Sequence, residues 1–164
     1  MPADSIQIIR ELDAIIQSWI SIHSQSVPLA STLGNLDEQI RTAAPDLLVS
    51  VLRTKSESTI AELRKTLRQY GHAIKQLDSL QRRLADEPVA GHGVRPADRQ
   101  AAYTTEYLRR RALFDALTKD TVSVAGFVGQ WAESKVDYAV EEEYLERLRL
   151  VRLARQWRSN QQEH

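Results

Sequence analysis

Few residues in this chain have the type and spacing that catalysis or metal binding requires. There is no Cys and there are four His among the 164 residues, so thiolate sites are excluded. A di-iron helical bundle needs Glu-x-x-His on inward helix faces, and that spacing does not occur. The run of acids from Glu141 to Glu143 places carboxylates on adjacent helix faces, which favours a solvated surface. We therefore expect no metal, no cofactor and no enzyme activity.

Two short motifs have a weak likeness to phosphate chemistry. His72 begins the sequence HAIK, and a helical His with Lys three residues later resembles histidine phosphotransfer domains. Those domains usually place Gly after the Lys, where this chain has Gln76, and the surrounding apolar pattern favours a seam or surface histidine. The glycines flanking His92 lack the Gly-Lys-Ser/Thr ending and the preceding strand of a phosphate-binding loop. His23, one turn after Trp19, is expected to be a partly buried helix residue.

Basic residues are concentrated in two stretches, LRRR at 108–111 and RLRLVRLARQWR at 147–158. On a helix, four of the five arginines of the second stretch, from Arg149 to Arg158, recur at steps of three and form a slowly drifting basic stripe. It could bind phosphates while an aromatic ring stacks on a base, or bind an acidic protein. A solvated face balanced by the acids at 141–146 remains the third interpretation. The candidate contact residues are Arg149, Arg152, Arg155, Trp157 and Arg158.

The apolar residues indicate helices throughout. In the first helix, which Asp4 or Ser5 can cap, they recur at steps of three and four. Pro28 lacks an amide hydrogen and disfavours helix at Val27, so this helix is expected to end near Ser26. A second, short helix then runs from Pro28 to about Ala43. The stripe residues are Ile9, Leu12, Ile16 and Trp19, followed by Leu29, Leu33, Leu36 and Ile40.

The middle of the chain carries the longest regular pattern. About four heptads predict a coiled-coil-like helix that begins just after Pro45 and includes Gly71. The seam residues are Ile60, Leu63, Leu67, Tyr70, Ile74, Leu77 and Leu84. Residues 87–96, rich in Pro and Gly, predict a loop. We therefore divide the chain into an N-terminal helical hairpin (1–86), this loop, a C-terminal helical group (97–158) and a polar tail (159–164).

Within the C-terminal group, apolar residues predict helices over 103–117, 124–131 and 138–151. The predicted fold class is therefore all-α: a long antiparallel, coiled-coil-like hairpin with a C-terminal helical bundle. The formal net charge is zero, with 22 basic and 22 acidic residues, so only a local patch could bind nucleic acid. Charged residues interrupt the apolar N-terminal stretch, and no charge-free run is long enough to cross a bilayer, so we expect no signal peptide and no membrane partner. We expect an intracellular protein, in the nucleus, the cytoplasm or both.

Several short motifs resemble two related families of small helical proteins. The N-terminal stretch, with Trp19, Pro28 and the sequence NLDEQI at 35–40, is similar to the helix pair of the AIRIM family. The sequence YTTEYLRRRALFDAL at 103–117 resembles a stretch shared by the AIRIM and CINP families. The sequence TVSVAGFVGQW at 121–131, followed by Val136 and Asp137, is similar to the C-terminal segment of CINP proteins. CINP proteins usually have a Pro in the intervening stretch, which is AESK here.

This resemblance implies a non-enzymatic adaptor subunit. Members of the two families pair with each other and adapt an AAA+ ATPase to its substrate in large ribosomal subunit maturation. CINP proteins are also tied to DNA replication and checkpoint control. Aromatic and Arg residues favour interfaces, so the predicted contacts with a related helical subunit and the ATPase are Trp19, Tyr107, Arg110 and Trp131. The alternative function is RNA binding by the Arg-rich C-terminal helix.

Overall fold

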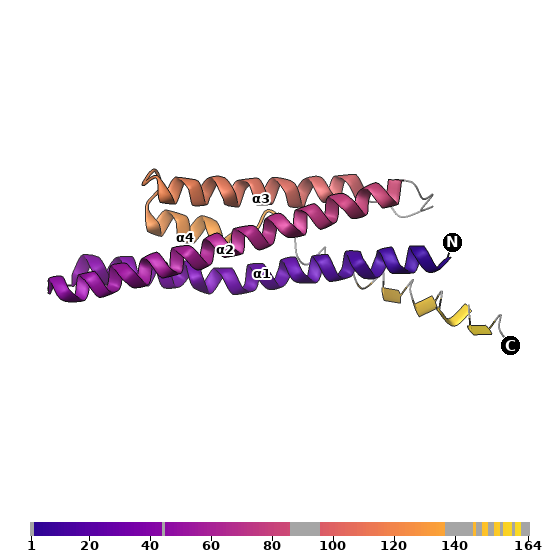
Figure 1. Cartoon of the computed structure of the whole chain (residues 1–164), viewed down its shortest axis with the longest axis horizontal. Coiled ribbons are helices and arrows are strands. Elements are labelled where there is room, and N and C mark those ends of the chain that lie inside the picture. The colour runs from indigo at the N-terminus through magenta and orange to yellow at the C-terminus, as the bar shows by residue number, and fades with distance from the viewer. Residues whose placement is uncertain are drawn as a thin grey trace.

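The computed structural model describes residues 2–43, 45–85 and 96–136, and ten residues between 146 and 161. Its helices are α1 (Pro2–Thr42), α2 (Asp46–Ala85), α3 (Pro96–Thr118) and α4 (Val124–Ala132). The predicted all-α class is confirmed, and α1 and α2 form the long antiparallel hairpin (Figure 1). The last ten described residues are 146, 149–150, 153–154, 156–158 and 160–161.

Helix α2 has the predicted heptad seam and begins, as expected, just after Pro45. Leu63, Tyr70 and Leu77 are buried at steps of seven, which places them on one helix face. Ala73 and Leu80 are also buried and extend that face toward the end of the helix. At 40 residues, α2 is about 60 Å long, so it provides the surface on which α1 and α3 pack.

The prediction that a helix ends near Ser26 is wrong, because α1 is continuous through Pro28. The inward positions explain why: Ile22 and Ser26 precede the proline, Ala30 and Leu33 follow it, and all four are buried. Their steps of four, four and three keep one face toward the core only if the helix continues. Burial on both sides of Pro28 therefore outweighs the cost of an interior proline.

Helix α3 runs back along α2, and a short turn connects it to α4. Helix α3 begins at Pro96, seven residues before the predicted start at Tyr103. Pro96 itself is the last residue of the loop predicted at 87–96, and it is helical. Asp120, with φ 55°, allows the backbone to turn after α3. Ser123 caps α4 by accepting a hydrogen bond from the amide of Gly126 at 3.0 Å.

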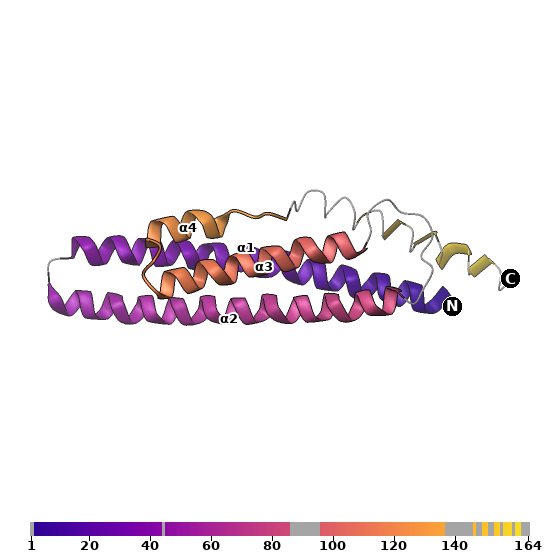
Figure 2. The same ribbon diagram turned by 90° about the horizontal axis from the view of Figure 1, so that it is seen from above.

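All four helices contribute to one apolar core. Helices α3 and α4 lie on the α1–α2 hairpin but end before its distal end, where α1 leads into α2 (Figures 1 and 2). Among the described residues, that end therefore consists of α1 and α2 alone. Most of the loop predicted at 87–96, most of the helix predicted at 138–151, and residues 159 and 162–164 of the tail lie outside the described residues.

One close approach explains a glycine inside α2. A Cβ built at Gly71 would lie 3.1 Å from the hydroxyl oxygen of Tyr107 on α3. Gly71 therefore gives Tyr107 room where α2 and α3 pack. Glycine at this position destabilises the helix by roughly 1 kcal/mol relative to alanine, and the contact with Tyr107 explains why it is nevertheless present.

Candidate functional site

Helix α3 turns two charged residues into the core of the bundle. Tyr103, Glu106 and Arg110 follow one another at steps of three and four, and all three are completely buried. Leu113 and Phe114 continue the same buried face. Fully buried Glu and Arg are rare unless they are paired, so this cluster is the most unusual chemical feature of the described structure.

Arg110 is held by hydrogen bonds from three directions. Its Nε donates to Oε1 of Glu106 at 2.8 Å, and its Nη1 donates to the carbonyl oxygen of Trp131 at 3.1 Å. Its Nη2 donates to Nδ1 of His23 at 2.9 Å and to the carbonyl oxygen of Glu133 at 3.2 Å. The guanidinium also lies 5.3 Å from the ring centre of Tyr70 and 5.0 Å from that of Trp131. Cation–π attraction thus adds to the hydrogen bonds.

Glu106 accepts hydrogen bonds from both neighbouring arginines. Arg109 approaches with two donors, its Nη2 lying 2.8 Å from Oε1 and its Nε lying 2.9 Å from Oε2. The amide of Lys135 also donates to Oε2, at 3.3 Å. Burial raises the pKa of Glu106, but the Arg109 hydrogen bond and the charges of Arg110 and Arg109 outweigh it. The pKa is therefore lowered and the carboxylate stays ionised.

The contact with Arg110 fixes the state of His23. An arginine side chain only donates hydrogen bonds, so Nδ1 of His23 must be the acceptor and carry no proton. Burial and then the charge of Arg110 lower the pKa of His23, while Glu106 acts in the opposite direction. His23 is half-buried, as the sequence predicted, and links α1 to the charged cluster on α3.

Aromatic residues surround this charged cluster. The ring centre of Trp19 lies 4.5 Å from that of Tyr70 and 4.9 Å from that of Tyr103, so α1, α2 and α3 meet there. On α4, Nε1 of Trp131 donates to Oγ of Ser26 at 3.1 Å. That bond joins α4 to α1 two residues before the proline. The cluster therefore connects all four helices.

The arrangement fixes backbone rather than presenting a reactive group. Arg109 and Arg110 together hold the carbonyl oxygens of Gln130, Trp131 and Glu133, at and just beyond the end of α4. These carbonyls lack partners within their own helix, and the arginines satisfy them. Among the described residues no group of three or more His, Cys, Asp and Glu could hold a metal.

Three of the four predicted partner contacts lie in this cluster. Trp19, Arg110 and Trp131 are fully buried by the chain's own helices, so they offer no surface to another protein in this conformation. Tyr107 is half-buried beside Gly71. The structure places Trp19 and Arg110 against Tyr70, and Trp131 against Arg110; their role as partner contacts stays a prediction.

The predicted basic contacts are only partly described. Nη2 of Arg149 lies 3.5 Å from Oδ1 of Asp13 on α1, and its Nη1 lies 3.4 Å from Oε2 of Glu146. Trp157 and Arg158 are exposed. Arg152 and Arg155 lie outside the described residues, as do the GHG motif and the acids at 141–143. RNA binding by this stretch stays a prediction.

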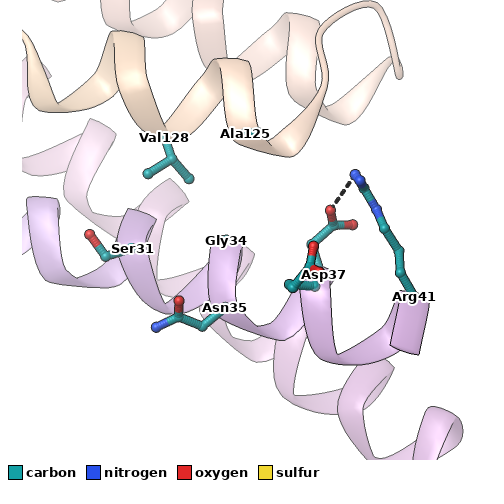
Figure 3. A pocket seen from close by; sticks show the side chains of 8 residues that line it. Ser31, Gly34, Asn35, Asp37, Arg41, Ala125 and Val128 are labelled. Atoms are coloured by element: carbon teal, nitrogen blue, oxygen red, sulfur yellow. Dashed lines mark ion pairs between the residues drawn. The ribbon is translucent and has the colours of Figure 1, made fainter. Parts of the chain in front are cut away.

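Two shallow grooves lie along α1. The first, of about 350 Å³, is lined by Ser31, Gly34 and Asn35 of α1 and by Ala125 and Val128 of α4 (Figure 3). An ion pair between Arg41 and Asp37, at 2.6 Å, closes one end of it. The second groove, of about 490 Å³, lies between α1 and α2. It contains His72 and Lys75, so His72 is a surface residue rather than part of the seam.

Sequence reasoning missed an exposed apolar surface at the distal end of the hairpin. Leu47 is 81% exposed, and Leu48 and Val51 are each 48% exposed. We call these three residues the distal patch. The seam of α2, continued back from Leu63 by steps of four and three, passes through Leu52 and Val49, so Leu47 and Val51 fall outside it. Sequence reasoning also missed the Glu106–Arg110 ion pair, although a spacing of four residues on a helix permits one.

No protein-family model, curated protein or solved structure matches this chain. The resemblance to the AIRIM and CINP families therefore rests on the short motifs alone. Of those motif residues, Trp19 and Trp131 lie in the core and Asn35 lines the groove between α1 and α4.

Proposed function

We propose that this chain is a non-catalytic adaptor that binds protein partners through the distal patch. The observation that carries the proposal is the exposure of Leu47, Leu48 and Val51 where the described part of the bundle consists of α1 and α2 alone. Clustered exposed apolar side chains typically mark an interaction site, whereas apolar residues scattered singly over a surface do not. Burial of these three side chains would provide a substantial share of a partner's binding energy.

The expected occupant of the distal patch is an apolar helix of another protein. Helices α3 and α4 lie along the middle of the hairpin and leave its distal end uncovered (Figure 2). A partner helix at that end would pack on the exposed face of α2, with three- and four-residue packing steps. Helices in apolar grooves are a common mode of recognition.

The identity of the partners comes from the family resemblance. It implies a related helical subunit and an AAA+ ATPase that acts in large ribosomal subunit maturation, with a further role in DNA replication and checkpoint control. In this proposal Trp19, Arg110 and Trp131 act indirectly. They fix the packing of the four helices, and this packing holds the distal patch in a fixed position.

Affinity purification with mass spectrometry tests both parts of the proposal. The tagged chain is compared with a variant that carries Leu47→Gln, Leu48→Gln and Val51→Gln. Leu108→Gln is the matched control, because Leu108 is also exposed but lies on α3. The wild type and the control are expected to recover an AAA+ ATPase and a helical subunit, and the triple variant is expected to lose them.

Two results would count against the proposal, each against a different part. If no AAA+ ATPase is recovered with the wild type, the assignment from the resemblance is wrong. If the triple variant keeps every partner of the wild type, the distal patch is not the contact surface. Urea unfolding of the purified triple variant checks that the fold is intact, and exposed positions predict little loss of stability.

A further inference from the structure

The C-terminal segment has a second exposed apolar surface. Every described residue from Glu146 to Gln161 has helical backbone. Leu150, Leu153 and Trp157 follow at steps of three and four and therefore share one face of a helix. They are 57%, 56% and 66% exposed, so the chain itself covers little of them. We call them the C-terminal stripe.

Positive charge flanks this stripe on both sides. At 100° per residue, Arg149 and Arg158 fall on opposite flanks of the stripe. The stretch 147–158 contains five Arg and no acidic residue, although the whole chain has no net charge. Arg149 contacts Asp13 of α1, so an ion pair from one flank ties the segment to the hairpin. The stripe itself remains open to solvent.

We propose that the C-terminal stripe docks on the surface of an anionic lipid bilayer. The leucines and Trp157 would enter the boundary between headgroups and acyl chains, while the flanking arginines reach lipid phosphates. Tryptophan is particularly suited to this boundary, because its ring is apolar and its N–H is polar. A basic amphipathic helix of this kind is attracted by the negative charge of phosphatidylserine-containing membranes.

The residue types favour a bilayer over nucleic acid. Phosphates of RNA would use the arginines and Trp157, but they would leave Leu150 and Leu153 in water. A bilayer would contact both the apolar side chains and the arginines of the helix. The basic stretch at 147–158 would be about 18 Å long as a helix, shorter than the roughly 30 Å of a hydrocarbon core. It would therefore lie in the plane of the membrane surface. None of the helices in the described part of the chain could cross a membrane.

Vesicle flotation with the full chain tests this inference independently of the adaptor function. The chain is expected to float with vesicles that contain phosphatidylserine and to stay in solution with phosphatidylcholine alone. The variant with Leu150→Gln and Leu153→Gln should bind at least about tenfold more weakly. Leu108→Gln, at a position of similar exposure (54%) on α3, is the matched control and should bind like the wild type.

A charge series gives a second comparison. Replacing Arg158 with Gln should weaken vesicle binding about fivefold, and replacing Arg149, which pairs with Asp13 and Glu146, should weaken it less. The matched control replaces Arg53 and Arg68, which are exposed residues of α2, and should have little effect. Rising salt should weaken binding of the wild type, because salt screens the attraction between arginines and headgroups.

The fluorescence of Trp157 can report how deeply the C-terminal stripe enters the bilayer. Trp19 and Trp131 are fully buried, so quenching by brominated lipids should report mainly on Trp157. Quenching is expected with phosphatidylserine vesicles and should disappear in Trp157→Phe. Equal flotation with both vesicle types, or undiminished flotation of the double leucine variant, would overturn the proposal. So would tighter binding to polyuridine than to vesicles that is insensitive to the leucine substitutions, because that result would assign the segment to RNA.

Discussion

Arg110 places a positive charge at the centre of the bundle, and its neighbours offset the cost of removing it from water. Four of its N–H groups have acceptors at 2.8–3.2 Å, and two aromatic rings face the guanidinium. Buried ion pairs are stabilising only when such additional contacts are made. The same contacts bring together α1, α2, α3 and the end of α4. At the scale of single residues, therefore, Arg110 defines how the helices meet.

Glu106→Gln should destabilise the protein strongly. The substitution removes the charge that pairs with Arg110 and Arg109 while the guanidinium of Arg110 stays buried. The expected loss in the free energy of unfolding is about 3–5 kcal/mol, measured by urea denaturation. Glu62→Gln is the matched control, because Glu62 pairs with Lys65 on the exposed surface of α2. It should change stability little. Equal effects of the two substitutions would contradict a central role for Glu106.

Stability should fall as the pH is lowered through the ordinary pKa of histidine. The pKa of His23 is lowered in the folded protein, mainly by burial, relative to the ordinary value of 6.5. The unfolded chain therefore takes up a proton first, and the free energy of unfolding decreases below about pH 6.5. Glu106 also has a lowered pKa, but its contribution is lost only below its ordinary value of 4.5. The two groups thus act in separate pH windows.

His23→Asn tests the assignment of the upper window. Asn can still accept a hydrogen bond from Arg110 but does not titrate. Between pH 7 and pH 5, the variant should therefore lose less stability than the wild type, as measured by urea unfolding at each pH. An identical pH dependence in both proteins would show that His23 does not control this window.

At the scale of elements, periodicity predicts most of the fold and fails at one proline. The seam of α2 could be predicted because Leu63, Leu67 and Tyr70 are spaced for one face and are buried on it. The continuity of α1 could not, because the local preference of Pro28 opposes it. What decides is the tertiary burial of residues on both sides of the proline, and that burial depends on α2 and α4 being in place.

Pro28→Ala should stabilise the protein. Proline has no N–H to donate to the carbonyl oxygen of Ser24, so one hydrogen bond of α1 is missing. Ser24 and Pro28 are both exposed, so replacing the proline disturbs no core contact. The free energy of unfolding should rise by roughly 1–3 kcal/mol in urea titration. Pro45→Ala, outside the helices, is the control with a smaller effect. Loss of stability in Pro28→Ala would indicate that the proline shapes the helix.

The candidate surfaces were harder to predict than the helices. Leu47 and Val51 are apolar residues of a helix like the buried residues of α2, but they lie off the face that carries Leu52 and Leu63 and are exposed. Conversely, the spacing of Arg110 places it on the buried face of α3, but its residue type is almost always exposed and so argued against burial. In both cases residue type and helix face disagree, and which of them holds is a property of the assembled bundle.

At the scale of the whole molecule, the helices share one core and should unfold together. Trp19 reports on the junction of α1, α2 and α3, while Trp131 reports on α4. We expect helix content, measured by circular dichroism, and the fluorescence of these two residues in a Trp157→Phe background to change in one coincident urea transition. Separate transitions would instead support independent folding of residues 1–86 and 97–158.

The length of α2 sets a minimum separation between the two ends of the molecule. The distal patch lies at one end, and the described residues of the C-terminal segment lie toward the opposite end (Figure 1). A 40-residue helix measures about 60 Å, more than the width of most small proteins. A bound partner shorter than this cannot contact both ends at once. The molecule has the geometry of a spacer, and shortening α2 by whole turns would change the distance between whatever it holds apart.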